Sequence, residues 1–130
     1  MSDFYIEKKI YYHDTDAGGV VYYASYLKHL EEGRSEYFRN LGLDTAEYAK
    51  NGIIFPVVRL EIDYKKPARY GDGIRVFTRP EMMGNASIHF FQEIKRGEDI
   101  LVFARVICAC VNRDLKPIKL PQELREKIGI

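Results

Sequence analysis

The sequence lacks tryptophan, has only two cysteines, and contains no long apolar run. Cys108 and Cys110 stand two residues apart, where a disulfide would be strained and two thiols alone make a poor metal site. We therefore expect both to be packed, free thiols. No apolar stretch reaches the roughly 20 residues of a membrane-spanning helix. The first ten residues, MSDFYIEKKI, lack the apolar run of a secretory signal, so we expect a cytoplasmic protein.

An excess of charge of either sign is also missing. With 20 basic and 19 acidic residues, the formal net charge is +1, which gives no general case for nucleic acid or an anionic membrane as partner. The G-x-S-x-G elbow of serine hydrolases and glycine-rich phosphate loops are absent, and the three histidines are not at ligand spacing. The 130 residues, 46% of them hydrophobic, suit one domain over residues 1–130, and we expect no metal.

The first half of the chain predicts one strand and two helices. Residues 4–12 are β-prone, and the apolar period changes to that of a helix over residues 22–41. Gly42 is a natural stop, and a short helix is expected at residues 44–50. The long helix should bury one stripe, made of Tyr23, Leu27, Leu30, Arg34, Tyr37, Phe38 and Leu41.

The second half predicts strands joined by short turns that contain glycine. We expect strands at residues 53–70, 74–80, 86–94 and 100–113, and a helical turn within 120–130. Early helices followed by a run of hairpins indicate an α+β fold, with one helix packed on an antiparallel sheet. The other sheet face would need a further partner, which hints at an oligomer.

One segment, HDTDAGGVVYYASYLKHLEEGR at residues 13–34, carries the chemistry. Two aspartates, a glycine pair and several tyrosines stand directly ahead of the predicted amphipathic helix. The first turn of a helix leaves about four N–H groups unpaired and favours negative charge. Asp16 in this position is either a catalytic carboxylate or a residue that caps a turn. Asp14 is expected to cap a turn or orient the loop.

This segment resembles the active-site segment of hotdog-fold acyl-CoA thioesterases, with the YbgC-type and 4-hydroxybenzoyl-CoA thioesterases as the closest groups. The matching positions are Asp14, Asp16, Gly19, Val21, Tyr23, Tyr26, Glu31 and Arg34, and the passage YKKPARYGD also matches. The resemblance implies a five-stranded antiparallel sheet wrapped around a long central helix. It further implies a homodimer or homotetramer with sites at the dimer interface, hydrolysis of acyl-CoA to acid and CoA, and no cofactor.

The resemblance also suggests roles for residues. Asp16 would be the general base or nucleophile, since the family places its catalytic aspartate there. The backbone N–H of Tyr23 would polarise the thioester carbonyl, and Gly18 and Gly19 would let the chain approach the ligand closely. YbgC-type enzymes commonly carry histidine where this chain has Tyr23, which leaves the acyl preference open.

Further residues are candidates for binding the substrate. Arg34 lies in the apolar stripe and is expected to pair with Glu31, three residues earlier. Glu31 would otherwise face the acyl pocket, or serve as the catalytic acid in place of Asp16. Residues Phe55, Pro56 and Val57 would line the acyl pocket or pack in the core. The phosphates of CoA would meet Lys65, Lys66 and Arg69, unless these are solvated surface charges.

Two other functions share these features. A dehydratase of the same fold would also act on acyl thioesters, but such enzymes pair a histidine with an acid, and the motif has no such histidine. A non-catalytic protein that binds an acyl carrier protein, or a cell-envelope complex, would not need an intact Asp16 motif.

Overall fold

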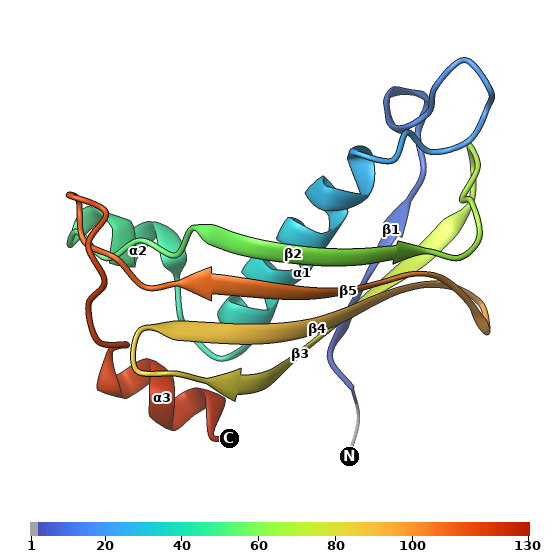
Figure 1. Ribbon diagram of the computed structural model, residues 1–130. Coiled ribbons are helices and arrows are strands. Elements are labelled where there is room, and N and C mark those ends of the chain that lie inside the picture. Colours follow the sequence, from blue (N-terminus) through green and yellow to red (C-terminus); the bar gives the residue numbers. More distant parts are fainter. Residues whose placement is uncertain (1–2) are drawn as a thin grey trace.

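A single antiparallel sheet forms the frame of the molecule. The computed structural model describes residues 3–130, so the first two residues of the N-terminal segment lie outside it (Figure 1). The strand order is β1-β3-β4-β5-β2, and each neighbouring pair is antiparallel. The five strands are β1 (Tyr5–Lys9), β2 (Val57–Tyr64), β3 (Gly73–Met83), β4 (Ser87–Arg96) and β5 (Asp99–Ala109). The predicted α+β class with a five-stranded antiparallel sheet is confirmed.

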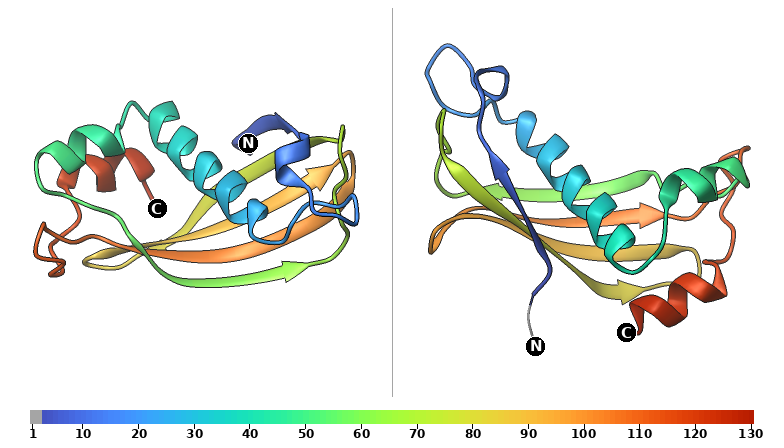
Figure 2. Two further views of the ribbon diagram at one scale, coloured as in Figure 1. Left: turned by 90° about the horizontal axis from the view of Figure 1, so that it is seen from above. Right: turned by 180° about the vertical axis from the view of Figure 1, so that it is seen from behind.

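One helix crosses the sheet, and shorter helices lie near the two ends of the sheet. Helix α1 (Ser25–Asn40) runs across the inner face of the curved sheet (Figure 2). The 3₁₀ turn η1 (Tyr12–Asp14) and the loop after it lie at one end, whereas α2 (Thr45–Lys50) and α3 (Gln122–Ile128) lie at the other (Figure 1). No helix within residues 3–130 is long and apolar enough to cross a membrane.

The core lies between α1 and the sheet. The inward positions of β3, β4 and β5 are fully buried, and α1 contributes Leu30, Tyr37 and Phe38 to the same cluster. Gly33 brings α1 close to β3, because a Cβ at this position would stand only 2.8 Å from Val76 Cγ1. Cys108 and Cys110 are buried free thiols, as expected.

Several strands are shorter than the sequence predicted. The strand predicted at residues 4–12 ends at Lys9, because the chain turns into η1. The strand predicted at residues 53–70 is β2 alone, since Pro56 and Pro67 flank it and cannot donate to a ladder. The short helix, the Gly42 stop and the C-terminal helical turn are confirmed.

The long helix begins later than predicted, at Ser25 instead of residue 22. A turn closed by the Ser25 N–H on the Tyr22 carbonyl, 2.8 Å away, precedes it. Tyr23 is therefore not part of the buried stripe and is 62% exposed, and Leu27 is 39% exposed. The rest of the stripe faces the sheet, with Arg34 and Leu41 only half-buried.

Candidate active site

The loop that carries Asp16 is a small hairpin. Thr15 and Val21 form an antiparallel bridge, and the Asp16 N–H donates to the Val20 carbonyl at 3.0 Å. Gly19 closes the turn with its N–H on the Asp16 carbonyl at 3.1 Å, and its φ of +80° suits a residue without Cβ. The hairpin presents Asp16 at its tip.

Asp16 is exposed, and its own side chain closes the turn in which it lies. Its Oδ1 accepts the Gly18 N–H at 2.8 Å, which is the geometry of an Asx turn. No group within residues 3–130 donates a hydrogen bond to its Oδ2. Asp16 is thus a turn residue with one carboxylate oxygen left open to solvent. The open oxygen is compatible with the chemical role that the sequence suggested.

Asp14, two residues earlier, has the opposite environment. Its side chain is fully buried, and its Oδ2 accepts the Tyr11 N–H at 3.0 Å. Its Oδ1 lies 3.2 Å from Lys28 Nζ and 3.3 Å from His29 Nε2. Burial acts to raise the pKa of Asp14, but the Tyr11 N–H, Lys28 and His29 together hold it below the usual value. Asp14 therefore caps the turn at η1 with its carboxylate.

The backbone between the hairpin and α1 supplies a free donor. The Tyr22 N–H donates to the Asp14 carbonyl at 2.8 Å, which closes the base of the hairpin. Among residues 3–130, no acceptor is in hydrogen-bond geometry with the Tyr23 N–H. Tyr23 lies two residues before α1 and not in its first turn. Its N–H is nevertheless free near the start of the helix.

A cavity of about 250 Å³ adjoins this segment. The Tyr64 hydroxyl donates to the Tyr23 carbonyl at 3.3 Å, and the Tyr26 hydroxyl accepts the Ala68 N–H at 3.0 Å. These bonds fix two of the aromatic walls. The cavity is lined by Val21, Tyr23, Tyr26, Tyr64, Lys65, Lys66 and Pro67. It thus joins tyrosine rings to two of the three predicted phosphate-binding residues.

The predicted phosphate-binding residues, Lys65, Lys66 and Arg69, lie at the end of the sheet that carries the hairpin. Lys65 Nζ stands 5.0 Å from the centre of the Phe103 ring, and Lys66 Nζ is 3.1 Å from Asp99 Oδ1. The backbone of Arg69 forms a bridge with Val20 in the hairpin. All three cations are exposed; Lys65 and Lys66 line the cavity beside Tyr23, and Arg69 adjoins the hairpin.

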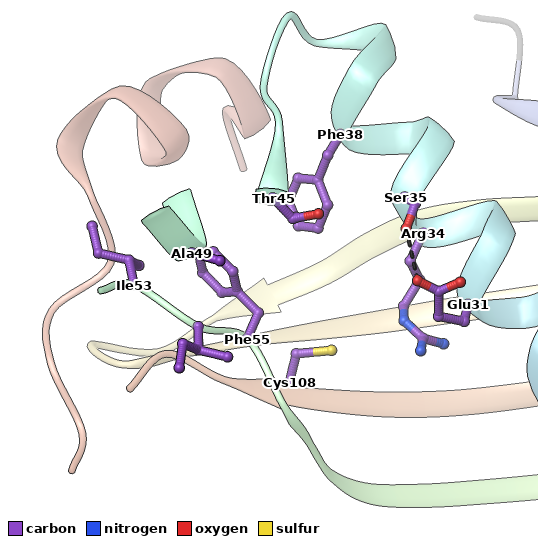
Figure 3. Close-up of a pocket in the computed structure, with 10 residues that line it drawn as sticks. Glu31, Arg34, Ser35, Phe38, Thr45, Ala49, Ile53, Phe55 and Cys108 are labelled. Atoms are coloured by element: carbon purple, nitrogen blue, oxygen red, sulfur yellow. Dashed lines mark hydrogen bonds between the residues drawn. The ribbon is translucent and has the colours of Figure 1, made fainter. Parts of the chain in front are cut away.

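A second cavity, of about 230 Å³, lies further along α1 (Figure 3). Apolar side chains from α1, α2 and the segment before β2 form most of its wall, including Phe38 and Phe55, while Glu31, Arg34 and Cys108 add polar groups. Of the predicted acyl-pocket residues, Glu31 and Phe55 line this cavity. Pro56 and Val57 do not, and Val57 is 46% exposed on the edge strand.

The predicted pair of Arg34 with Glu31 does not form. Arg34 Nη1 donates to Gln92 Oε1 at 3.0 Å, whereas Glu31 Oε1 accepts the Ser35 hydroxyl at 2.9 Å (Figure 3). Burial lowers the pKa of Arg34 and raises that of the neighbouring Cys108. Gln92 is fully buried on β4, far away in the chain, so helical spacing alone could not reveal this partner.

Two residues near the loop were missed from the sequence. His29 and Lys28 both reach Asp14, although neither is at the spacing of a known motif. A signal existed for His29 alone: it stands three residues after Tyr26 and four before Gly33, which are both on the buried side of α1. No group of three or more metal-ligating side chains occurs in the part of the chain that the structure describes.

Comparison with known proteins places the chain in a family. Residues 11–128 match the family model described as the thioesterase-like superfamily. The acyl-CoA thioesterase YbgC of Haemophilus influenzae is 38% identical over 119 residues, which cover 90% of this chain and 88% of that protein.

Solved structures give the same assignment. A probable thioesterase from Bartonella henselae is 34% identical with a TM-score of 0.88, over 92% of this chain and all 100% of that one. The DHNA-CoA thioesterase from Staphylococcus aureus is 29% identical with a TM-score of 0.90, over 95% and 86% of the two chains. The expected family of thioester hydrolases is confirmed, and this chain belongs to the thioesterase-like superfamily.

Proposed function

We propose that the protein hydrolyses acyl-CoA thioesters to a free acid and CoA, with Asp16 as the catalytic carboxylate. One observation carries the proposal. The hairpin holds Asp16 at its tip with an open Oδ2, in the same short segment as the unpaired Tyr23 N–H. Thioester hydrolysis needs an activated nucleophile and a donor for the oxyanion, and these two groups are of the required kinds.

The chemistry follows from these two groups. As general base, Asp16 takes a proton from water while the water oxygen attacks the carbonyl carbon; as nucleophile, its own oxygen attacks and water later cleaves the anhydride. In both routes the C–S bond breaks, and the CoA sulfur leaves as thiolate and takes up a proton. The Tyr23 N–H would stabilise the oxyanion, and loss of one such donor typically costs about 10²–10³ in rate.

The substrate would span the two cavities. Lys65, Lys66 and Arg69 would meet the phosphates of CoA near the hairpin, because exposed cations form charge-assisted hydrogen bonds with phosphate oxygens. Gly18 and Gly19 leave room for the thioester next to Asp16. The acyl group would reach toward the cavity that Glu31 and Phe55 line, whereas Pro56 and Val57 lie outside this lining.

A homodimer would complete the site. The free edge of β2 exposes Val57, Val58 and Tyr64, with Val58 61% exposed, whereas the other edge, β1, ends in three consecutive charged residues at 7–9. Exposed apolar edge strands pair readily, and charged ones resist pairing. Dimerisation through β2 would place the partner beside Tyr64 and the hairpin cavity. Two such dimers would make the expected homotetramer.

The direct test is thiol release from a panel of acyl-CoAs with short aliphatic, long aliphatic and aromatic acyl groups, with a thiol-reactive dye as reporter. We expect turnover of at least one member, with the free acid detected in equal amount. Turnover of saturated acyl-CoAs also separates hydrolysis from dehydration. The proposal fails if no acyl-CoA and no acyl carrier protein thioester is cleaved, and a role in binding a carrier or envelope protein would then be favoured.

A further inference from the structure

A buried histidine links the base of the Asp16 hairpin to the rest of the molecule. His29, on α1, is 1% exposed, and it is the only histidine so deeply buried within residues 3–130. Its Nε2 stands 3.3 Å from Asp14 Oδ1, and its Nδ1 stands 3.3 Å from Glu32 Oε1. One imidazole thus lies between two carboxylates, and burial of these polar groups costs free energy unless hydrogen bonds and charge pairs offset it.

The contact network extends to three parts of the fold. Glu32 Oε2 lies 3.1 Å from Lys8 Nζ on β1, and Lys28 Nζ lies 3.2 Å from Asp14 Oδ1. His13 Nδ1 adds a longer contact, 3.6 Å, to the same Asp14 oxygen. Each carboxylate that faces His29 therefore also contacts a lysine, Glu32 through Lys8 of β1 and Asp14 through Lys28 of α1.

Asp14 is the point at which this network reaches the hairpin. Its carboxylate contacts His29, while its backbone carbonyl accepts the Tyr22 N–H at 2.8 Å. Asp16 follows two residues later. A shift of Asp14 would thus move both strands of the hairpin that presents Asp16.

We propose that His29 is a positioning residue for thioester hydrolysis: through Asp14, it holds the hairpin at the place where Asp16 can act. The proposal rests on the function proposed above. His29 does not touch the substrate cavities, since it lines neither of them.

The proton on His29 determines how well it bridges the two carboxylates. A neutral imidazole carries one N–H and faces the other carboxylate with a lone pair, whereas the cation donates to both. Nε2 currently lacks hydrogen-bond alignment with any group in residues 3–130. Burial lowers the pKa of His29, although Asp14 and Glu32 act to raise it. At neutral pH His29 thus carries one N–H; placed on Nε2 it faces Asp14, and a glutamine amide at the same place can donate to Asp14 instead.

Three substitutions separate the two contacts. In His29→Gln the amide group lies about where Nε2 lies, so the contact to Asp14 is kept. In His29→Asn the shorter amide lies about where Nδ1 lies, so only the contact to Glu32 is kept. His29→Phe removes both contacts but fills the space. Leu124→Ala, in α3 at the opposite end of the sheet, is a control for general loss of stability.

We expect kcat to fall about tenfold to a hundredfold in His29→Asn and His29→Phe, with KM unchanged, because small misplacement of a reacting group has effects of this size. His29→Gln should keep most of the wild-type kcat, and Leu124→Ala should keep kcat despite a lower Tm. Amide hydrogen exchange over residues 15–21 should become faster in the Asn and Phe variants only.

Two results would overturn the proposal. One is an unchanged kcat in His29→Phe; the other is a loss of kcat in all four variants, Leu124→Ala included, that simply follows the fall in Tm. If the wild type cleaves no thioester, the proposed function fails, and hydrogen exchange still decides whether His29 holds the hairpin. Exchange unchanged across the His29 variants would then reject the positioning role.

Discussion

At the scale of residues, two aspartates two positions apart illustrate how burial separates roles. Asp14 is fully buried and held by three side chains and one backbone N–H, whereas Asp16 is exposed with an open oxygen. The sequence motif singled out both, and it suggested that the first orients the loop. It could not reveal His29, because burial of that side chain depends on how α1 faces η1.

Acid should weaken the fold through Asp72, which accepts the Arg69 N–H at 2.9 Å and Arg96 Nη1 at 2.8 Å. Burial acts to raise its pKa, but these two donors hold the pKa below its usual value of 3.8. The unfolded chain therefore binds the proton first, and the stabilisation present above that value is lost as pH falls through the folded-state pKa.

Urea unfolding of wild type and Asp72→Asn at pH 7 and pH 3 measures this effect. We expect the variant to be less stable at pH 7 by about 1–3 kcal/mol, the usual contribution of a hydrogen bond to a charged group. The deficit should shrink at pH 3. A deficit that is equal at both pH values would contradict the role of the Asp72 charge.

At the scale of elements, the sequence predicted the type of nearly every helix and strand but not where each ends. Period and turn residues indicated the β3–β4–β5 meander, because glycine and charged residues mark its turns. The start of α1 was misplaced because Tyr22 and Tyr23 continue the apolar pattern, although the Tyr22 N–H closes the hairpin and the Tyr23 N–H is free. Arg34 was given the wrong partner because Gln92 reaches it from another element.

The contact of α1 with the sheet should depend on Gly33. Alanine is favoured over glycine in a helix by about 1 kcal/mol, yet an added Cβ would meet Val76 at 2.8 Å and Thr78 at 2.9 Å. Overpacking of this kind typically costs about 1–3 kcal/mol. We therefore expect Gly33→Ala to lower the free energy of unfolding, measured by urea denaturation.

The matched control is Gly73→Ala, since nothing lies within 4 Å of a Cβ at this position. It should change stability much less than Gly33→Ala. If Gly33→Ala instead stabilises the protein, α1 does not approach β3 as closely as described.

At the scale of the whole molecule, the exposed edge of β2 is the feature that a single chain leaves unexplained. We expect Val58→Lys to weaken the proposed dimer at least tenfold, in keeping with the cost of placing a charge in an apolar contact, about 1–3 kcal/mol or more. Sedimentation velocity over a range of concentrations measures the change. Turnover should fall together with the fraction of dimer.

Leu115→Lys serves as the control for Val58→Lys, because Leu115 is 70% exposed in a loop away from the sheet edges. It should leave the oligomeric state unchanged. A wild type that is monomeric at high concentration, or a Val58→Lys dimer as tight as the wild type, would rule out pairing through β2.

The proposed catalytic carboxylate is Asp16 at the hairpin tip, and not Glu31 on α1. Asp44 offers a matched control for Asp16, because its Oδ1 accepts the Ala46 N–H at 2.9 Å in the same type of contact. Asparagine preserves that contact at both positions, so loss of a turn and loss of a carboxylate can be told apart.

The decisive measurement is kcat/KM for the best acyl-CoA substrate in wild type, Asp16→Asn, Glu31→Gln and Asp44→Asn. We expect a loss of at least about a hundredfold in Asp16→Asn alone, the order of effect typical of a general base. Glu31→Gln should change the preference among acyl groups more than the rate. Full turnover by Asp16→Asn, with activity lost in a folded Glu31→Gln, would contradict the account and move the catalytic carboxylate to α1.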